Sequence, residues 1–369
     1  MRFFSTNIGR AGSCELGGPG QSSPRGIFRM SAGACGICVL LLAACLPFLG
    51  LVVGNAAELG VIGSSFTLNG RPTFLLGASY YGALGASEEF ISRDLDDLRR
   101  HGFNWIRVWA TWAAFTNDVS AVDAEGNARP PFLEKLGALV GKCDRRGMVV
   151  DVTLSRANGV PRPGQLPSLA AHRRAVETLV TALKTQRNWY LDLANERNIR
   201  DQRYVSMDEV RQLCELAKRL DPKRLMTASH AGGDLSRDEV RNYVLEARLD
   251  FLAPHRPREV GSAGQTEAKT QEVLAWMREL GRVVPIHYQE PFRRGYGGWQ
   301  PGSVEFLADR RGAQAGGAAG WCLHNGDTRG RSDGEPRRSF DLRVHRLFEQ
   351  WDDEERAFLM QMQPDQPKP

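Results

Sequence analysis

Several signatures of other protein classes are missing from this sequence of 369 residues. It has no run of basic residues, no zinc-ligand spacing and no RNA-binding motif, so we expect no nucleic-acid partner. No Gly-rich phosphate motif follows any predicted strand, which disfavours a nucleotide-binding sheet. No Gly-x-Ser-x-Gly motif occurs, which disfavours a lipase or esterase.

Cysteine is scarce in the part of the chain that we expect to fold. Four of the seven cysteines lie in the first 57 residues, and the other three, Cys143, Cys214 and Cys322, are far apart. An odd number at wide spacing is no disulfide framework, and no Cys/His cluster has the spacing of metal ligands. We therefore expect buried cysteines that act as small hydrophobic residues, and no metal or other cofactor.

Residues 1–57 differ in kind from the rest of the chain. Arg10, Arg25 and Arg29 precede an uncharged apolar run over 31–53, followed by small residues, which is the order of a secretory signal. The run exceeds the usual signal core of about 7 to 15 residues, so an uncleaved membrane anchor fits as well. Leu-Ala-Ala-Cys45 also resembles a bacterial lipobox. All three alternatives place residues 58 onward outside the cytoplasm, with membrane contact only through this segment.

From residue 58 onward, strand-like and helix-like segments alternate, as in a parallel sheet with crossover helices. Eight strands are predicted, at 73–77, 104–109, 148–154, 189–194, 225–229, 251–255, 283–289 and 318–323. Helices are predicted at 90–101, 132–146, 168–185, 207–220, 237–247, 266–280, 304–314 and 342–351. This repetition, with no second composition zone, favours a single (β/α)8 TIM barrel over 58–351, with a tail at 352–369. We expect a monomer.

Two acidic residues stand where a predicted strand ends. Asn195 and Glu196 follow the apolar segment 189–194, and Glu290 follows the segment 283–289. In a parallel barrel all strands end at the same mouth, where such enzymes keep their chemistry, so the two carboxylates should meet across it. Cleavage of a glycosidic bond needs this arrangement, with one carboxyl group to protonate the leaving oxygen and one carboxylate to attack or stabilise the sugar carbon.

Four features in strand order resemble clan A glycoside hydrolases, closest to the cellulase-like family five barrels. They are Phe-Asn-Trp-Ile-Arg107-Val-Trp on strand two, Asn195-Glu196 after strand four, Glu290 after strand seven and Trp321 on strand eight. The similarity covers about residues 66 to 350. Each motif alone is weak, and it is their order that carries the resemblance.

The resemblance implies a role for each of these residues. Glu196 would be the acid/base and Glu290 the nucleophile of a retaining reaction. Arg107 would orient the nucleophile, Asn195 would bind the sugar 2-hydroxyl, and Trp321 would form a platform under the sugar ring. Independently, a glutamate that shares its site with a second carboxylate tends to have a raised pKa, while an arginine keeps its neighbour ionised.

The sequence departs from the family pattern at two places. Arg197 follows Asn-Glu where the family usually has proline, and the His-x-Tyr pattern of strand six reads His255-Arg256-Pro257, without the tyrosine. Tyr288, two residues before Glu290 and therefore on the same strand face, is the expected replacement. We count His255 and Tyr288 among the substrate-binding candidates.

Arginines gather in the loops after predicted strands three, six, seven and eight. They are Arg156, Arg162, Arg256, Arg258, Arg293, Arg294, Arg329, Arg331, Arg337 and Arg338. Because arginine binds carboxylates bidentately, they suggest an acidic glycan such as a uronate-containing chain. The alternative is a composition bias, since arginine outnumbers lysine throughout.

The sequence therefore predicts an exported glycosidase that cleaves a β-linked poly- or oligosaccharide by a retaining double displacement. Two alternatives stay open. One is a transglycosylase, in which a sugar replaces water, and the other is a carbohydrate-binding relative without turnover.

Overall fold

The computed structural model describes residues 56–115, 117–156, 163–201, 203–294, 299–325 and 340–362. All of them belong to one unit of the chain, residues 53–369. Residues 1–55 of the predicted signal or anchor lie outside the described residues, as do Arg162, Arg329, Arg331, Arg337 and Arg338. No described helix is both long and apolar enough to span a membrane.

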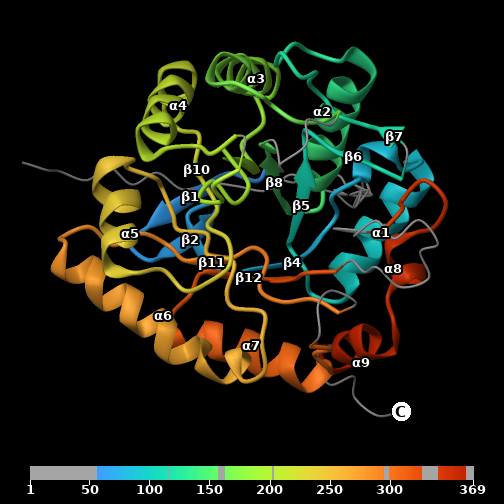
Figure 1. Cartoon of the computed structure of the whole chain (residues 1–369). Coiled ribbons are helices and arrows are strands. Elements are labelled where there is room, and N and C mark those ends of the chain that lie inside the picture. The colour runs from blue at the N-terminus through green and yellow to red at the C-terminus, as the bar shows by residue number, and fades with distance from the viewer. Residues whose placement is uncertain are drawn as a thin grey trace, which may run out of the picture. The chain divides into compact units, whose positions relative to one another are not determined.

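Seven parallel strands form the central sheet, and helices surround it (Figure 1). The strands are β4 (Leu75–Ser79), β5 (Trp105–Trp109), β8 (Val149–Thr153), β9 (Trp189–Asp192), β10 (Met226–Thr227), β11 (His287–Tyr288) and β12 (Gly320–Leu323). Their order in the sheet is β10-β9-β8-β5-β4-β12-β11.

Residues 250–255 take the remaining position between β10 and β11. His230 pairs with Pro254 and Leu252 with Ile286, both in parallel bridges. The amide of His287 also donates to the carbonyl of Leu252 at 2.8 Å. These contacts join the two edges of the curled sheet, which thereby forms an α/β barrel. The predicted sixth strand is reduced to bridges because proline has no amide hydrogen to continue the ladder.

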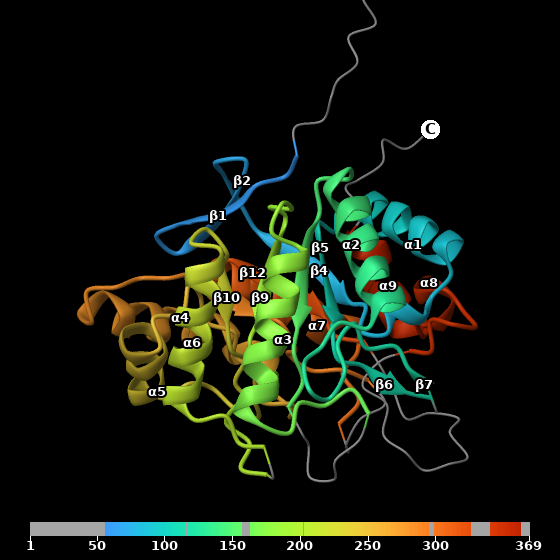
Figure 2. The same ribbon diagram turned by 90° about the horizontal axis from the view of Figure 1, so that it is seen from above.

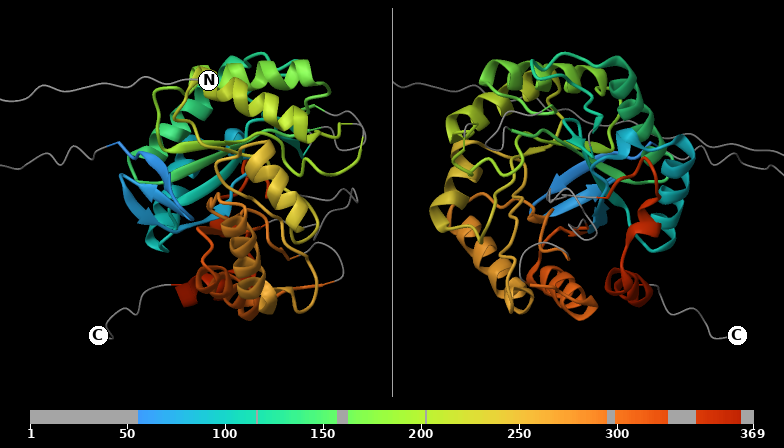
Figure 3. Two further views of the ribbon diagram at one scale, coloured as in Figure 1. Left: turned by 90° about the vertical axis from the view of Figure 1, so that its left-hand side faces the viewer. Right: turned by 45° about the vertical axis from the view of Figure 1, so that its right-hand side comes forward.

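Apart from α9, which the sequence did not predict, the outer helices begin close to where they were expected. They are α1 (Glu88–Arg100), α2 (Pro130–Asp144), α3 (Leu169–Ala182), α4 (Met207–Leu220), α5 (Arg237–Arg241), α6 (Ser262–Glu279), α7 (Ser303–Gly316), α8 (Leu347–Gln350) and α9 (Asp353–Met362). Serine side chains cap α1, α3, α4 and α5 by accepting a backbone amide of the first turn, from positions 87, 168, 206 and 236. Figure 3 shows these helices outside the strands in two further views.

Side chains of the barrel strands alternate between two cores. Leu75, Trp105, Val149 and Tyr190 belong to the core inside the barrel, whereas their chain neighbours pack against the helices. Gly77 also faces inward, since an added Cβ would lie 1.8 Å from the carbonyl oxygen of Trp105. Because successive side chains of a strand point to opposite faces, only every second residue of a barrel strand faces inward and can reach the site.

A small antiparallel sheet of β1 (Leu59–Ile62), β2 (Ser65–Leu68) and β3 (Arg71–Thr73) precedes the first barrel strand. In Figure 2 it lies at the opposite end from the hairpin of β6 (Ala113–Ala114) and β7 (Asn117–Asp118). Phe66 reaches into the inner core, with its ring centroid 5.0 Å from that of Phe251. The small sheet therefore covers the end of the barrel at which the strands begin.

The folded part continues past the predicted end of the barrel at residue 351. On α9, the ring of Phe358 packs against Trp321 of β12 at 5.4 Å and against Phe306 of α7 at 6.0 Å between centroids. Residues 353–362 therefore belong to the helical layer and not to the tail.

Candidate active site

Glu290 is the most firmly held acid at the C-terminal ends of the strands. Its Oε1 accepts from Arg107 Nη1 and from the Tyr81 hydroxyl, both at 2.6 Å, and its Oε2 accepts from Arg258 Nη2 at 3.0 Å. Burial alone would raise the pKa of Glu290, but His255, Arg107 and Arg258 outweigh it and hold the pKa well below its usual range. These charges therefore favour the ionised form of Glu290.

Glu196 is held by its backbone as well as by its side chain. Its φ of 52° is in the left-handed region, its amide donates to Ser229 Oγ at 2.9 Å and its carbonyl accepts from Arg156 Nε at 2.7 Å. Its Oε1 lies 3.2 Å from His255 Nδ1. Burial and the charge of Glu290 raise the pKa of Glu196, but His255 and Arg258 bring it down to about 2, so the raised pKa expected for the acid is not found.

The two carboxylates meet as the sequence analysis expected. One ligand atom each of Glu196, His255 and Glu290 lies within 4.8 Å of the other two. The nearest carboxylate oxygens of Glu196 and Glu290 are therefore no more than 4.8 Å apart. Retaining glycosidases hold their two carboxyl groups closer together, at roughly 5 to 5.5 Å, than inverting ones, at roughly 6.5 to 9.5 Å. The same three side chains are close enough to bind a metal ion, although Arg107 and Arg258 already neutralise the acids.

Arg107 of β5 connects these groups inside the barrel. Besides Glu290, its guanidinium contacts Asp192 at 2.7 Å, Asn195 Oδ1 at 3.0 Å and Asp151 at 3.1 Å, and it is fully buried. Burial raises the pKa of Asp151 to about 8, with Arg107 opposing and Asp192 adding to the shift. Arg107 and Asn195 therefore lie at the site, and Glu290 and Asp192 supply the carboxylates that a buried cation requires.

The structure corrects the expected placement of Trp321. Its side chain is fully buried, and its indole nitrogen donates to Asp309 Oδ2 of α7 at 2.6 Å. It faces the helices because strand alternation turns Cys322 inward and Trp321 outward. Trp321 consequently cannot serve as a sugar platform.

Tyr288 is likewise not at the site. Its hydroxyl lies 2.6 Å from Thr270 Oγ1 on α6, within the helical layer. The strand ends at Tyr288, and a bend at Gln289 and Glu290 breaks the alternation that would have put Tyr288 and Glu290 on one face. His255, in contrast, lies 3.2 Å from Glu196 and 3.5 Å from Glu290 Oε2.

Sequence reasoning missed the contacts of two residues. Tyr81, after β4, supplies the hydroxyl that the strand-six tyrosine of the family pattern would give to the nucleophile. Arg258 spans both catalytic candidates, 3.0 Å from Glu290 and 3.9 Å from Glu196. Their positions after a strand were the available signal, but the contacts depend on loop geometry.

Four of the loop arginines fall into two groups. Arg156, Arg256 and Arg294 pair with Asp201, Asp234 and Asp352. These three neutralise nearby acids and stabilise loops, whereas Arg258 pairs with the catalytic candidates themselves.

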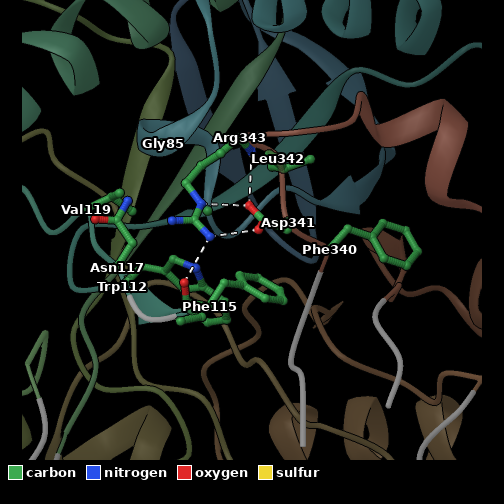
Figure 4. A pocket seen from close by; sticks show the side chains of 11 residues that line it. Gly85, Trp112, Phe115, Asn117, Val119, Phe340, Asp341, Leu342 and Arg343 are labelled. Atoms are coloured by element: carbon green, nitrogen blue, oxygen red, sulfur yellow. Dashed lines mark hydrogen bonds and ion pairs between the residues drawn. The ribbon is translucent and has the colours of Figure 1, made fainter. Parts of the chain in front are cut away.

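A shallow surface pocket lies beside this site. Figure 4 shows part of its lining, with Arg343 bridging Asp341 and the carbonyl of Phe115. Trp112 also lines the pocket, and its ring centroid is 5.4 Å from that of Tyr81, which binds Glu290. The rings of Trp112 and Tyr81 therefore connect the pocket to Glu290.

The sequence matches no protein-family model and no curated protein. Solved structures do match. The endo-1,4-β-mannanase of Rhizomucor miehei has a TM-score of 0.59 and 12% identity, covering 83% of this chain and 98% of that one. A family 5 glycoside hydrolase from Bacteroides vulgatus has a TM-score of 0.60 and 15% identity, covering 80% of this chain and 68% of that one.

Another match is a candidate glycoside hydrolase from Bacteroides vulgatus, with a TM-score of 0.60 and 16% identity. It covers 78% of this chain, which spans only 58% of that structure. At these identities the likeness concerns the fold. The chain has the barrel fold of family 5 and related glycoside hydrolases.

Proposed function

We propose that this barrel is a retaining glycosidase acting on a β-linked poly- or oligosaccharide. The observation that carries the proposal is the pair Glu196 and Glu290 at the ends of two barrel strands, with oxygens within 4.8 Å. The two carboxylates have different surroundings. Arg107 and Tyr81 both donate hydrogen bonds to Glu290, and neither of these hydrogen bonds reaches Glu196. The mannanase and mannosidase activities named for structural neighbours support a carbohydrate substrate.

In the proposed reaction, Glu290 attacks the anomeric carbon while Glu196 protonates the departing oxygen. A covalent glycosyl-enzyme forms, and Glu196 then removes a proton from the water that releases the sugar. Arg107 and Tyr81 hold Oε1 of Glu290, which leaves Oε2 as the attacking atom. A sugar that replaced the water would give transglycosylation by the same steps.

Release of reducing ends from a panel of β-glycans tests this proposal. We expect the full chain to be active, and the Glu290→Gln and Glu196→Gln variants to lose nearly all activity. Glu272→Gln is the matched control, because Glu272 is exposed and pairs with Lys269 on the same helix, away from the two candidate acids. Activity that survives in Glu290→Gln would contradict the assignment.

Azide distinguishes the two roles. With an activated aryl β-glycoside, Glu290→Ala should yield the α-glycosyl azide, because azide enters from the face of the missing carboxylate. Glu196→Ala should yield the β-glycosyl azide, because azide attacks the glycosyl-enzyme from the opposite face. If Glu290→Ala gave the β-glycosyl azide and Glu196→Ala the α-glycosyl azide, Glu196 would be the nucleophile and Glu290 the acid/base.

The alternative is a barrel that binds carbohydrate without turnover. It is favoured by one observation, the guanidinium of Arg258 lying against both carboxylates. Sugar binding by folded protein, without product from any glycan, would establish this alternative.

We also propose that the barrel works outside the cytoplasm. The support is the order of basic, apolar and small residues in the first 57 positions. Fractionation of the native host, with the mass of the mature chain, would test both export and cleavage.

A further inference from the structure

Arg258 differs from the other cations of the site in being partly open to solvent. Its side chain is 24% exposed, whereas that of Arg107 is fully buried. Its Nε donates to the carbonyl of Pro291 at 3.0 Å, and its Nη2 donates to Glu290 Oε2 at 3.0 Å. A substrate that approaches the two carboxylates therefore meets this guanidinium.

The atom that Arg258 binds is the one required for attack. Arg107 and Tyr81 both hold Oε1 of Glu290, whereas Arg258 holds Oε2. Arg258 also lies 3.9 Å from Glu196 Oε1. Attack would be favoured by a sugar that separates Arg258 from Oε2, because this hydrogen bond withdraws negative charge from the attacking oxygen.

A neutral sugar has no charged group with which to replace this contact. Hydrogen bonds between charged groups contribute about 1.5 to 3 kcal/mol, so their uncompensated loss is a substantial barrier. A carboxylate on the sugar would instead give the guanidinium a partner of the same chemistry, with bidentate geometry. The acidic sugar would also meet less repulsion, since Arg107 and Arg258 neutralise Glu290.

We infer that Arg258 recognises a sugar carboxylate at the cleavage position, so that the substrate is a β-linked glycan containing uronic acid. The inference rests on the proposed glycosidase function. Binding of the carboxylate draws Arg258 away from Oε2 of Glu290 and frees this oxygen to attack. The paired loop arginines, Arg156, Arg256 and Arg294, take no part.

The test uses two pairs of tetrasaccharides that differ only in the oxidation of C6. They are β-1,4-linked mannotetraose with tetramannuronate, and cellotetraose with β-1,4-linked tetraglucuronate. Hydrolysis by the full chain is compared with that by Arg258→Gln and Arg258→Lys. The control is Arg237→Gln, which removes a positive charge from an exposed pair with Glu279.

We expect wild type and the Arg237→Gln control to prefer the acidic member of at least one pair. Arg258→Gln should reduce that preference roughly 10- to 100-fold, as expected for the loss of a charged hydrogen bond. Arg258→Lys should keep part of the preference for the acidic sugar, since lysine retains the positive charge but not the bidentate geometry of the guanidinium. Equal use of both members by wild type, or a preference unchanged in Arg258→Gln, overturns the inference and leaves the glycosidase standing.

Calorimetric binding of the same four sugars separates the inference from the proposed function. Acid-selective binding that is lost in Arg258→Gln, with no product from these sugars or from any glycan of the panel, would support carboxylate recognition by Arg258 and overturn the glycosidase. Charge-indifferent binding, or no binding of any of the four by wild type, would overturn the role of Arg258.

Discussion

At the scale of single residues, Tyr81 has a defined part in the proposed reaction. Its hydroxyl donates to Glu290 at 2.6 Å, while its ring packs on Trp109 and Trp112 at 5.2 and 5.4 Å between centroids. Tyr81→Phe keeps the ring contacts and removes the hydrogen bond. We expect kcat/KM to fall roughly 10- to 100-fold with little change in the melting temperature. A large fall in thermal stability would instead indicate a structural role.

The pH dependence of activity follows from the acid that must carry a proton. The pKa of Glu196 is about 2 and that of Glu290 is lower than usual, so at neutral pH both are ionised and the competent form is rare. Because kcat/KM reports the free enzyme, we expect it to increase as pH falls from 7 to 4. Circular dichroism at each pH controls for unfolding. An optimum near neutral pH would contradict this expectation.

Residue chemistry that depends on strand ends could be predicted from the sequence. That Glu196, Glu290 and Arg107 lie together could be predicted, because the ends of parallel strands meet at one mouth and a buried arginine requires a carboxylate. The contacts of Arg258 could not be predicted, because its loop conformation is set by distant partners.

At the scale of elements, the pairing of β12 with α7 depends on Asp309. This fully buried carboxyl accepts from Trp321 at 2.6 Å and also bonds the Thr266 hydroxyl, and burial raises its pKa to about 6. A raised pKa in the folded state adds stability at low pH that is lost as pH rises through about 6. Asp309→Asn keeps an acceptor and cannot ionise.

We therefore expect wild type to lose stability relative to Asp309→Asn between pH 4 and 7.5. A shift of about two pH units corresponds to up to about 3 kcal/mol. Urea unfolding of both proteins at the two pH values measures the difference. A difference independent of pH would show that Asp309 ionises in the folded state as easily as in the unfolded one.

The positions of most elements were predictable, but the faces of their side chains were not. The apolar strand at 320–323 contains large or sulfur-bearing residues on both faces, so its sequence alone does not tell which side Trp321 takes. The expectation for Tyr288 was wrong for another reason, since the bend after β11 reverses the alternation just before Glu290.

At the scale of the whole barrel, α9 completes the helical layer over β12 and α7. Phe358 and Leu359 are buried there, although the sequence suggested a tail from residue 352. A chain that ends at Trp351 would expose the apolar surface around Phe306. Loss of two buried side chains, partly offset by the freed backbone, should lower the unfolding free energy by at least about 2 kcal/mol.

The matched control for this truncation ends at Met362, which keeps α9 and removes only residues 363–369. We expect the control to melt within a few degrees of the full chain and the shorter chain to melt well below both. Equal melting temperatures for the two truncated chains would show that α9 adds nothing to stability.

The left-handed backbone at Glu196 places the requirements of activity and of thermal stability in conflict. A φ of 52° is unfavourable for a residue with a side chain, and glycine adopts it without strain. Selection for heat resistance alone should therefore tolerate or favour glycine at this position, at the expense of the proposed acid. Laboratory evolution of the barrel for thermal tolerance would need a simultaneous screen for turnover, since otherwise the most robust descendants would be the inactive ones.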